Sequence, residues 1–198
     1  MQRRSVLIAG LLVSAALAGC ASSRGSGGSG NWVTLLDGKS LTGWNQIGNG
    51  NWRIEDGLVV GDKGKAGFLV SPRTYKDFQI RAEFWASDDA NSGIFIRGED
   101  AQKMTGTNAY EVNIYDKRPD PSYATGAIVN VARAPMVFKA GGRWNTFVIT
   151  ARGPILTVDF NGVRTVDNVR DTAHASGYLG LQSDGGVIKF RKLEIREL

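Results

Sequence analysis

Apolar and polar residues alternate in several short runs along the chain, and Gly, Asn and Asp separate these runs. Alternation with period two is typical of a β-strand that has one buried face. The run 77–87 shows it most clearly, with Phe78, Ile80, Ala82 and Phe84 on one side. Further runs of this kind are 91–98, 109–116, 145–153, 155–162, 163–168 and 187–195. Because no segment has the pattern of a long amphipathic helix, we predict an all-β fold.

Two local patterns refine this prediction. The dipeptide Asn161-Gly162 favours a two-residue hairpin turn, because both of its positions tolerate positive φ. The last run holds its apolar residues in one phase up to Phe190 and in the other from Leu193, which predicts a β-bulge at residues 191–192. Many short strands with frequent turn signals favour a two-sheet antiparallel sandwich, and a closed barrel is the alternative.

The N-terminus has the features of an export signal. Arg3 and Arg4 precede an apolar run that ends in small residues, so we interpret residues 1–19 as a signal peptide. An uncleaved membrane anchor is the alternative. The tetrapeptide LAGC at 17–20 resembles the bacterial lipoprotein box, which implies a lipid on Cys20. Residues 20–30 are rich in Gly and Ser and predict a flexible linker, and 31–198 has the length of a single domain.

Composition limits the classes of function. Cys20 is the only cysteine, so the domain has no internal disulfide. The formal charge of +5 falls to about +3 without Arg3 and Arg4, and the basic residues are scattered, which argues against nucleic acid as a partner. The single histidine, His174, excludes a histidine-rich zinc site and fits a surface or turn residue.

A divalent cation would therefore need oxygen ligands. Asp116 and Asp120 could supply them, although Asp beside Pro in a loop also fits ordinary turn formation.

The neighbouring strands 91–98 and 109–116 carry the candidate chemistry. If Ile94 and Ile96 face the core, their neighbours in the alternation face outward. The outward side chains are then Phe95, Arg97, Glu111, Asn113 and Tyr115. Aromatic rings suit the apolar faces of a sugar, and fixed charges and amides suit its hydroxyls, so we predict a saccharide as ligand.

A simpler interpretation competes with this one. Any strand with one solvated face alternates in this way, and Arg97 with Glu111 would then be a cross-strand ion pair of small energetic value. The exposed aromatic residues favour a binding site, because Phe95, Tyr115 and also Trp85 on one outward face would form an apolar patch.

The motifs of the whole domain resemble one family. They are LLDGKSLTGW (35–44), NWRIEDGLVVG (51–61), YKDFQIRAEFW (75–85), NSGIFIRG (91–98), YEVNIYD (110–116), TGAI (125–128), GGRWNTFVI (141–149), FNG (160–162) and GYLGLQSDGGVIKFRKLEI (177–195). Together they resemble the 3-keto-disaccharide hydrolase domain family, long known as a domain of unknown function. The resemblance implies a concanavalin A-like or laminin-G-like jelly-roll sandwich whose concave sheet binds carbohydrate. It also implies cleavage of 3-keto-glycosides.

The resemblance further implies roles for individual residues. A carboxylate removes the C2 proton of the 3-keto sugar, and the enolate expels the glycosidic oxygen at C1. Glu111 matches the general base, Arg97 the enolate partner or substrate clamp, and Asp116 a second carboxylate that orients Arg97 or holds a cation. The residues expected to bind substrate are Asn91, Phe95, Asn113, Tyr115, Gln182 and Asp184.

One position departs from the family pattern. Where members read L-Q-D-H-G, this chain has Asp184 in place of the histidine, so Asp184 is either an oxygen ligand or acid, or a mark of lost catalysis. The alternatives to an enzyme are a lectin-like carbohydrate-binding lipoprotein and a structural or partner-binding protein of the cell envelope. Ala21 and Ser22 after Cys20 imply lipid anchoring in the outer membrane, facing the periplasm, in an organism with two membranes.

Overall fold

A computed structural model describes residues 30–62 and 64–198 of the chain. The predicted signal peptide, Cys20 and almost all of the linker lie outside these residues. No helix in the described part is long and apolar enough to cross a membrane. Its strands are β1 (Val33–Leu36), β2 (Asn45–Ile47), β3 (Asn51–Glu55), β4 (Leu58–Asp62), β5 (Gly67–Tyr75), β6 (Phe78–Ala86), β7 (Ser92–Gly98), β8 (Tyr110–Ile114), β9 (Trp144–Arg152), β10 (Ile155–Phe160), β11 (Val163–Arg170), β12 (Gly177–Ser183) and β13 (Ile188–Glu197). A 3-10 turn, η1 (Pro121–Tyr123), follows β8.

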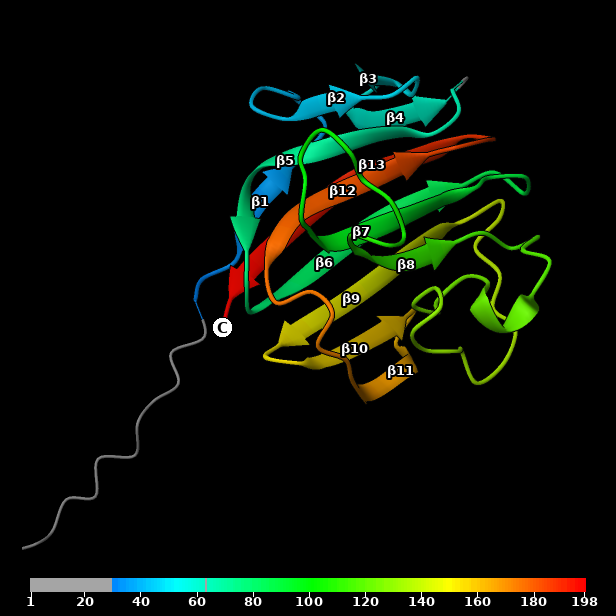
Figure 1. Cartoon of the computed structure of the whole chain (residues 1–198). Helices are drawn as coiled ribbons and strands as arrows, with labels where there is room; N and C mark the ends of the chain where they lie inside the picture. The colour runs from blue at the N-terminus through cyan, green and yellow to red at the C-terminus, as the bar shows by residue number, and fades with distance from the viewer. Residues whose placement is uncertain (1–29, 63) are drawn as a thin grey trace, which may run out of the picture.

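The strands form two antiparallel sheets that pack face to face (Figure 1). The larger sheet has the order β11-β10-β9-β6-β13-β4-β3, and β1 pairs with β13 beside this path. The smaller sheet has the order β2-β5-β12-β7-β8. Since the two sheets share no ladder, the predicted sandwich is confirmed and the alternative of a closed barrel is wrong.

The core lies between the sheets and follows the alternation of the sequence. Phe84, Phe147 and Phe160 extend inward from the larger sheet and are almost fully buried. Their ring centroids lie 5.1 Å apart for Phe84 and Phe147, and 5.2 Å apart for Phe147 and Phe160. Ile94 and Ile96 of β7 belong to the same cluster from the opposite sheet. Burial of these large side chains is the main stabilising contribution to the fold.

The predicted turn and bulge are both present. Asn161 and Gly162 have φ values of 49° and 80° and connect β10 to β11, as a two-residue hairpin turn requires. The register between β13 and β6 shifts between Phe190 and Lys192, which confirms the bulge. The shift keeps the apolar residues on both sides of it directed into the core.

The outward face of the smaller sheet is partly covered by the loop 99–109, which crosses it between β7 and β8 (Figure 1). Met104 of this loop packs so closely on β7 and β12 that a methyl group at Gly98 would lie 2.4 Å from its sulfur. Beneath the loop, Phe95 meets Phe68 edge-on at 5.0 Å. Phe95 is only 1% exposed, so the prediction of an outward aromatic surface at this residue is wrong.

Candidate functional site

The candidate site lies on the outward face of β7, β8 and β12, around Gly93. The predicted pairing of β7 with β8 is confirmed, with Phe95 opposite Glu111 and Gly93 opposite Asn113. On the other side of β7, Leu181 pairs with Ile94, and this register places Gln182 next to Gly93. Gly93 therefore lies between two amide side chains on the outward face and adds no side chain of its own there.

Glu111 is the chemically most unusual residue of this face. Its carboxylate makes no hydrogen bond or ion pair with the residues that the structure describes. A methyl group at Gly93 would lie 3.2 Å from Glu111 Cγ, and one at Gly106 would lie 3.6 Å from Glu111 Oε2. Thus β7 on one side and the loop 99–109 on the other confine this carboxylate.

The environment of Glu111 makes its carboxyl group a weaker acid than that of an ordinary glutamate. Burial raises the pKa of its carboxyl to about 7, the positive charge of Arg118 opposes this rise, and the negative charge of Asp184 adds to it. A general base works best when its pKa lies near the working pH. Glu111 is therefore suited to accept and return a proton near neutrality.

Two buried amide oxygens flank Gly93. Asn113 Nδ2 donates to the carbonyl oxygen of Tyr123 at 2.7 Å, whereas Asn113 Oδ1 has no donor within the described residues. Gln182 Oε1 is also buried without a donor there. Buried polar atoms almost always have a hydrogen-bond partner, so these two oxygens are available to accept hydrogen bonds from water or from the hydroxyls of a ligand.

Asp184 lies at the rim of the site and is held on both sides. Its Oδ1 accepts a hydrogen bond from the backbone N–H of Ala66 at 2.6 Å, and its Oδ2 accepts one from Asn91 Nδ2 at 3.1 Å. Its backbone N–H also donates to the carbonyl oxygen of Asn91. Asp184 and Asn91 therefore form one unit that fixes a negative charge close to Glu111.

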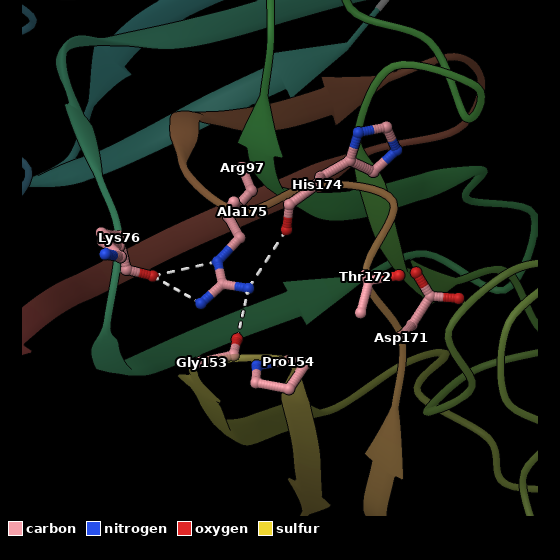
Figure 2. A pocket seen from close by; sticks show the side chains of 8 residues that line it. All are labelled: Lys76, Arg97, Gly153, Pro154, Asp171, Thr172, His174 and Ala175. Carbon is pink, nitrogen blue, oxygen red and sulfur yellow. Dashed lines mark hydrogen bonds between the residues drawn. The ribbon is translucent and has the colours of Figure 1, made fainter.

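Arg97 does not lie on this face, so the prediction that it faces outward beside Glu111 is wrong. Its φ of 56° breaks the alternation of β7 and turns the side chain toward the end of the sandwich, where it is 1% exposed. The guanidinium donates to the carbonyl oxygens of Lys76, Gly153 and His174 (Figure 2). It also forms an ion pair with Asp77 at 3.1 Å.

The hydrogen bonds of Arg97 show that it stabilises the fold. Its Nε donates once and each of its terminal nitrogens twice, so all the N–H groups of the guanidinium are used. Burial lowers its pKa, and Asp77 acts in the opposite direction. A neighbouring pocket of about 270 Å³ is lined by Lys76, Arg97, Gly153, Pro154, Asp171, Thr172, His174 and Ala175. Arg97 offers this pocket no free donor.

Asp116 is likewise separate from Arg97, and the prediction that it orients Arg97 is wrong. Its carboxylate accepts hydrogen bonds from Thr125 Oγ1 at 2.6 Å and from the backbone N–H groups of Ala140 and Gly141 at 2.9 Å. Asp116 therefore holds together separate parts of the long connection between β8 and β9. It also lines a second pocket of about 360 Å³, together with Asp88, Lys117 and Lys139.

The oxygen ligands considered for a cation do not form a cluster. Asp120 caps the 3-10 turn η1 by accepting hydrogen bonds from Ser122, so it fulfils the turn role. Among residues 30–62 and 64–198, no group of three or more His, Cys, Asp or Glu side chains could hold a metal ion.

The remaining predicted residues divide between the two sheets. Trp85 lies on the outward face of the larger sheet, where it pairs with Trp144, so the prediction that it shares a face with Phe95 and Tyr115 is wrong. Tyr115 directly follows β8 and is partly buried, and its carbonyl oxygen accepts a hydrogen bond from the backbone N–H of Arg118. The turn 115–118 brings Arg118 near enough to Glu111 for its charge to act on that carboxyl group.

Arg118 is the site residue that the sequence did not reveal. Its positive charge acts on Glu111, whereas the sequence analysis expected Arg97 to be the cation on the same face as Glu111. Arg118 belongs to a loop, and a loop has no alternation from which the direction of a side chain could be predicted.

Comparison with protein families confirms the resemblance found in the motifs. The family model described as 3-keto-alpha-glucoside-1,2-lyase-like domain matches residues 31–196. A 3-keto-disaccharide hydrolase from Bacteroides thetaiotaomicron is 26% identical over 145 residues, which are 58% of this chain and 50% of that protein. The chain thus spans about half the length of this curated relative.

Solved structures confirm the jelly-roll architecture. A protein from Parabacteroides distasonis ATCC 8503, provisionally assigned as a glycosyl hydrolase, superposes with a TM-score of 0.70 at 24% identity, covering 85% of this chain and all of that one. The carbohydrate-binding module CBM66 from Bacillus subtilis superposes with a TM-score of 0.56 at 15% identity, covering 79% of this chain and 92% of the module. At these identities the similarity concerns the fold alone.

Proposed function

Since the chain belongs to the family of 3-keto-alpha-glucoside-1,2-lyase-like domains, we propose that it cleaves the glycosidic bond of 3-keto-glycosides with Glu111 as the general base. The observation that carries this proposal is a confined carboxylate with a pKa of about 7. Within the described part of the chain it has no hydrogen-bond or ion-pair partner, and the two buried amide oxygens beside it have no donor. The named activity of the Bacteroides relative supports it.

The reaction uses the acidity that a C3 ketone gives to the C2 hydrogen. Glu111 takes the C2 proton, and the electrons of that C–H bond form an enolate with the C3 carbonyl. The enolate then re-forms the ketone with a C1–C2 double bond while the C1–O bond breaks. The departing oxygen takes up a proton, which protonated Glu111 can supply. Water adds to the enone afterwards, and the net result is hydrolysis.

The other site residues bind the sugar and balance charge. Asn113 Oδ1 and Gln182 Oε1 accept hydrogen bonds from sugar hydroxyls on either side of Gly93. Arg118 stabilises the negative charge that develops on the enolate, because a fixed cation in a partly desolvated site acts on developing charge. Asp184 and Asn91 hold the rim, and the negative charge of Asp184 adds to the rise in the pKa of Glu111 that burial causes.

Methyl 3-keto-α-glucoside and its β anomer test the proposal directly. We expect release of methanol from at least one anomer and exchange of the C2 proton in D₂O, both followed by NMR. The matched control is the methyl glucoside without the ketone, which should show neither reaction. Parallel samples with and without a chelator test dependence on a metal ion.

Other results would contradict the proposal. Equal cleavage of the unoxidised glucoside would show that the C3 ketone is not used. Binding of the keto sugar without C2 exchange or cleavage would make the protein a carbohydrate-binding module. No binding to any glycan would favour the envelope protein that binds a partner.

The pH dependence should report the environment of Glu111. Because the ionised carboxylate is the base, we expect kcat/KM to rise with pH and to level off above about 7. Asp184→Asn removes a negative charge that raises this pKa, so the rise should move to lower pH. Asp88→Asn, in the pocket beside Asp116, is the control that should leave the profile unchanged. A profile of Asp184→Asn identical to that of the wild type would refute this electrostatic role.

A further inference from the structure

The outward face of the larger sheet carries tryptophans that are stacked with basic side chains. Three tryptophans, one before β1, one on β6 and one on β9, contact cations within 4.2–5.3 Å of their ring centroids. We call the outward face of β6, β9 and β13, together with Trp32, the tryptophan face. Its residues in cation–π contact are Trp32, Arg81, Trp85, Trp144, Lys189, Arg191 and Arg196. Trp144 is 38% exposed, so this indole presents much of its surface to solvent on the outward face of the larger sheet.

The tryptophan face concentrates the positive charge of the domain. The outward side chains of β6, β9 and β13 include six basic residues, Arg81, Arg152, Lys189, Arg191, Lys192 and Arg196, and two acidic residues, Glu83 and Glu194. Both acidic residues are already paired, with Arg191 at 2.5 Å and with Lys192 at 3.0 Å. Residues 30–198 as a whole hold 21 basic residues against 19 acidic ones. The excess of four positive charges on this face therefore exceeds that of the whole domain.

Cation–π pairing alone does not account for this arrangement. An exposed pair of this kind contributes only a modest stabilisation and requires no net charge around it. A surface that is flat, rich in tryptophan and basic is typical of proteins that lie on an anionic membrane, where indole rings sit at the headgroup level and basic side chains meet lipid phosphates.

The first described residues, from Gly30 onward, lie beside the same face. The backbone N–H of Gly30 donates to the carbonyl oxygen of Glu197 at 2.9 Å, so the preceding segment joins the domain beside the end of β13. Trp32, the first side chain of the tryptophan face, follows directly. Nine residues, 21–29, lie between Cys20, the predicted lipid site, and Gly30, and these ten Cα–Cα steps span at most about 35 Å. An anchor at Cys20 would thus keep this face close to a bilayer.

We infer that the tryptophan face rests on the surface of a membrane that contains anionic phospholipids. The outward face of the smaller sheet points the opposite way, because the two sheets pack through their inner faces. The Glu111 site would then be directed away from the bilayer and open to soluble sugars. The inference rests on the other sheet, so it does not depend on the proposed function.

Vesicle binding tests this inference with a chain of residues 21–198, which contains every described strand and cannot carry a lipid on Cys20. We expect it to co-sediment with vesicles of phosphatidylethanolamine and phosphatidylglycerol and to show a blue shift of tryptophan fluorescence. It should not bind vesicles of phosphatidylcholine. The triple variant Arg81→Gln, Arg152→Gln, Lys189→Gln should lower the partition coefficient by about a hundredfold, since each basic residue near an anionic surface contributes about fivefold.

The control is a triple variant with the same loss of charge on the loops before and after β8, Lys103→Gln, Lys117→Gln, Arg133→Gln. We expect it to bind the anionic vesicles nearly as well as the unmodified chain. Equal losses for both variants would indicate attraction by net charge alone and would overturn the inference. So would binding to dextran sulfate without binding to vesicles, because the face would then take an acidic polysaccharide.

Discussion

Glu111→Gln is expected to lower kcat for a 3-keto-glycoside by about 10²–10⁴-fold, the usual contribution of a general base. Glutamine has nearly the same shape and cannot accept the C2 proton, so binding of the sugar should change little. The measurement is kcat and KM for the anomer that the wild type cleaves, together with C2 exchange in D₂O. Glu55→Gln, at the exposed end of β3, is the control that should retain full activity.

The same variant should be more stable than the wild type at alkaline pH. Folding raises the pKa of Glu111 from 4.5 to about 7, so the folded state disfavours its ionised form. The wild type therefore has its full stability below about pH 4.5 and loses part of it as the pH rises through about 7. The two pKa values correspond to about 3 kcal/mol, which Glu111→Gln should recover at about pH 9 but not at about pH 4.

Urea unfolding at these two pH values measures this difference. A stabilised, inactive variant would show that the loss of turnover comes from the missing base and not from unfolding. Turnover equal to that of the wild type would remove Glu111 from the proposed mechanism.

Arg97→Met should lower the free energy of unfolding by about 3–5 kcal/mol, the cost of breaking a buried, hydrogen-bonded ion pair from one side. The substitution leaves the carbonyl oxygens of Lys76, Gly153 and His174 without the donor that joins them. These carbonyls belong to three separate loops at one end of the sandwich. The guanidinium therefore connects the two sheets where no strand pairing does.

Urea unfolding of Arg164→Met provides the comparison. Arg164 also forms ion pairs, with Asp159 and Asp167, but it is exposed, so its removal should cost less than about 1 kcal/mol. An Arg97→Met protein as stable as the wild type, but inactive, would contradict the structural role and return Arg97 to the catalytic site.

The alternation of apolar and polar residues predicted β6–β11 and β13, but it did not reveal β1–β5 or β12. It correctly placed Glu111 and Asn113 opposite β7, because a period of two fixes which side chains share a face. Asn161-Gly162 and the phase change before Leu193 were equally informative, since both express local backbone requirements. The family motifs extended this agreement to the jelly roll as a whole.

The tertiary structure decided what the alternation could not express. A single positive φ turned Arg97 out of the outward row, and the loop that carries Met104 buried Phe95. A loop without periodicity supplied Arg118 as the charge near Glu111. The sequence by itself therefore determined the strands with clear alternation and most of the faces they present. Only the folded chain decided which of those faces remain open, because loops and local backbone geometry depend on contacts between residues far apart in the sequence.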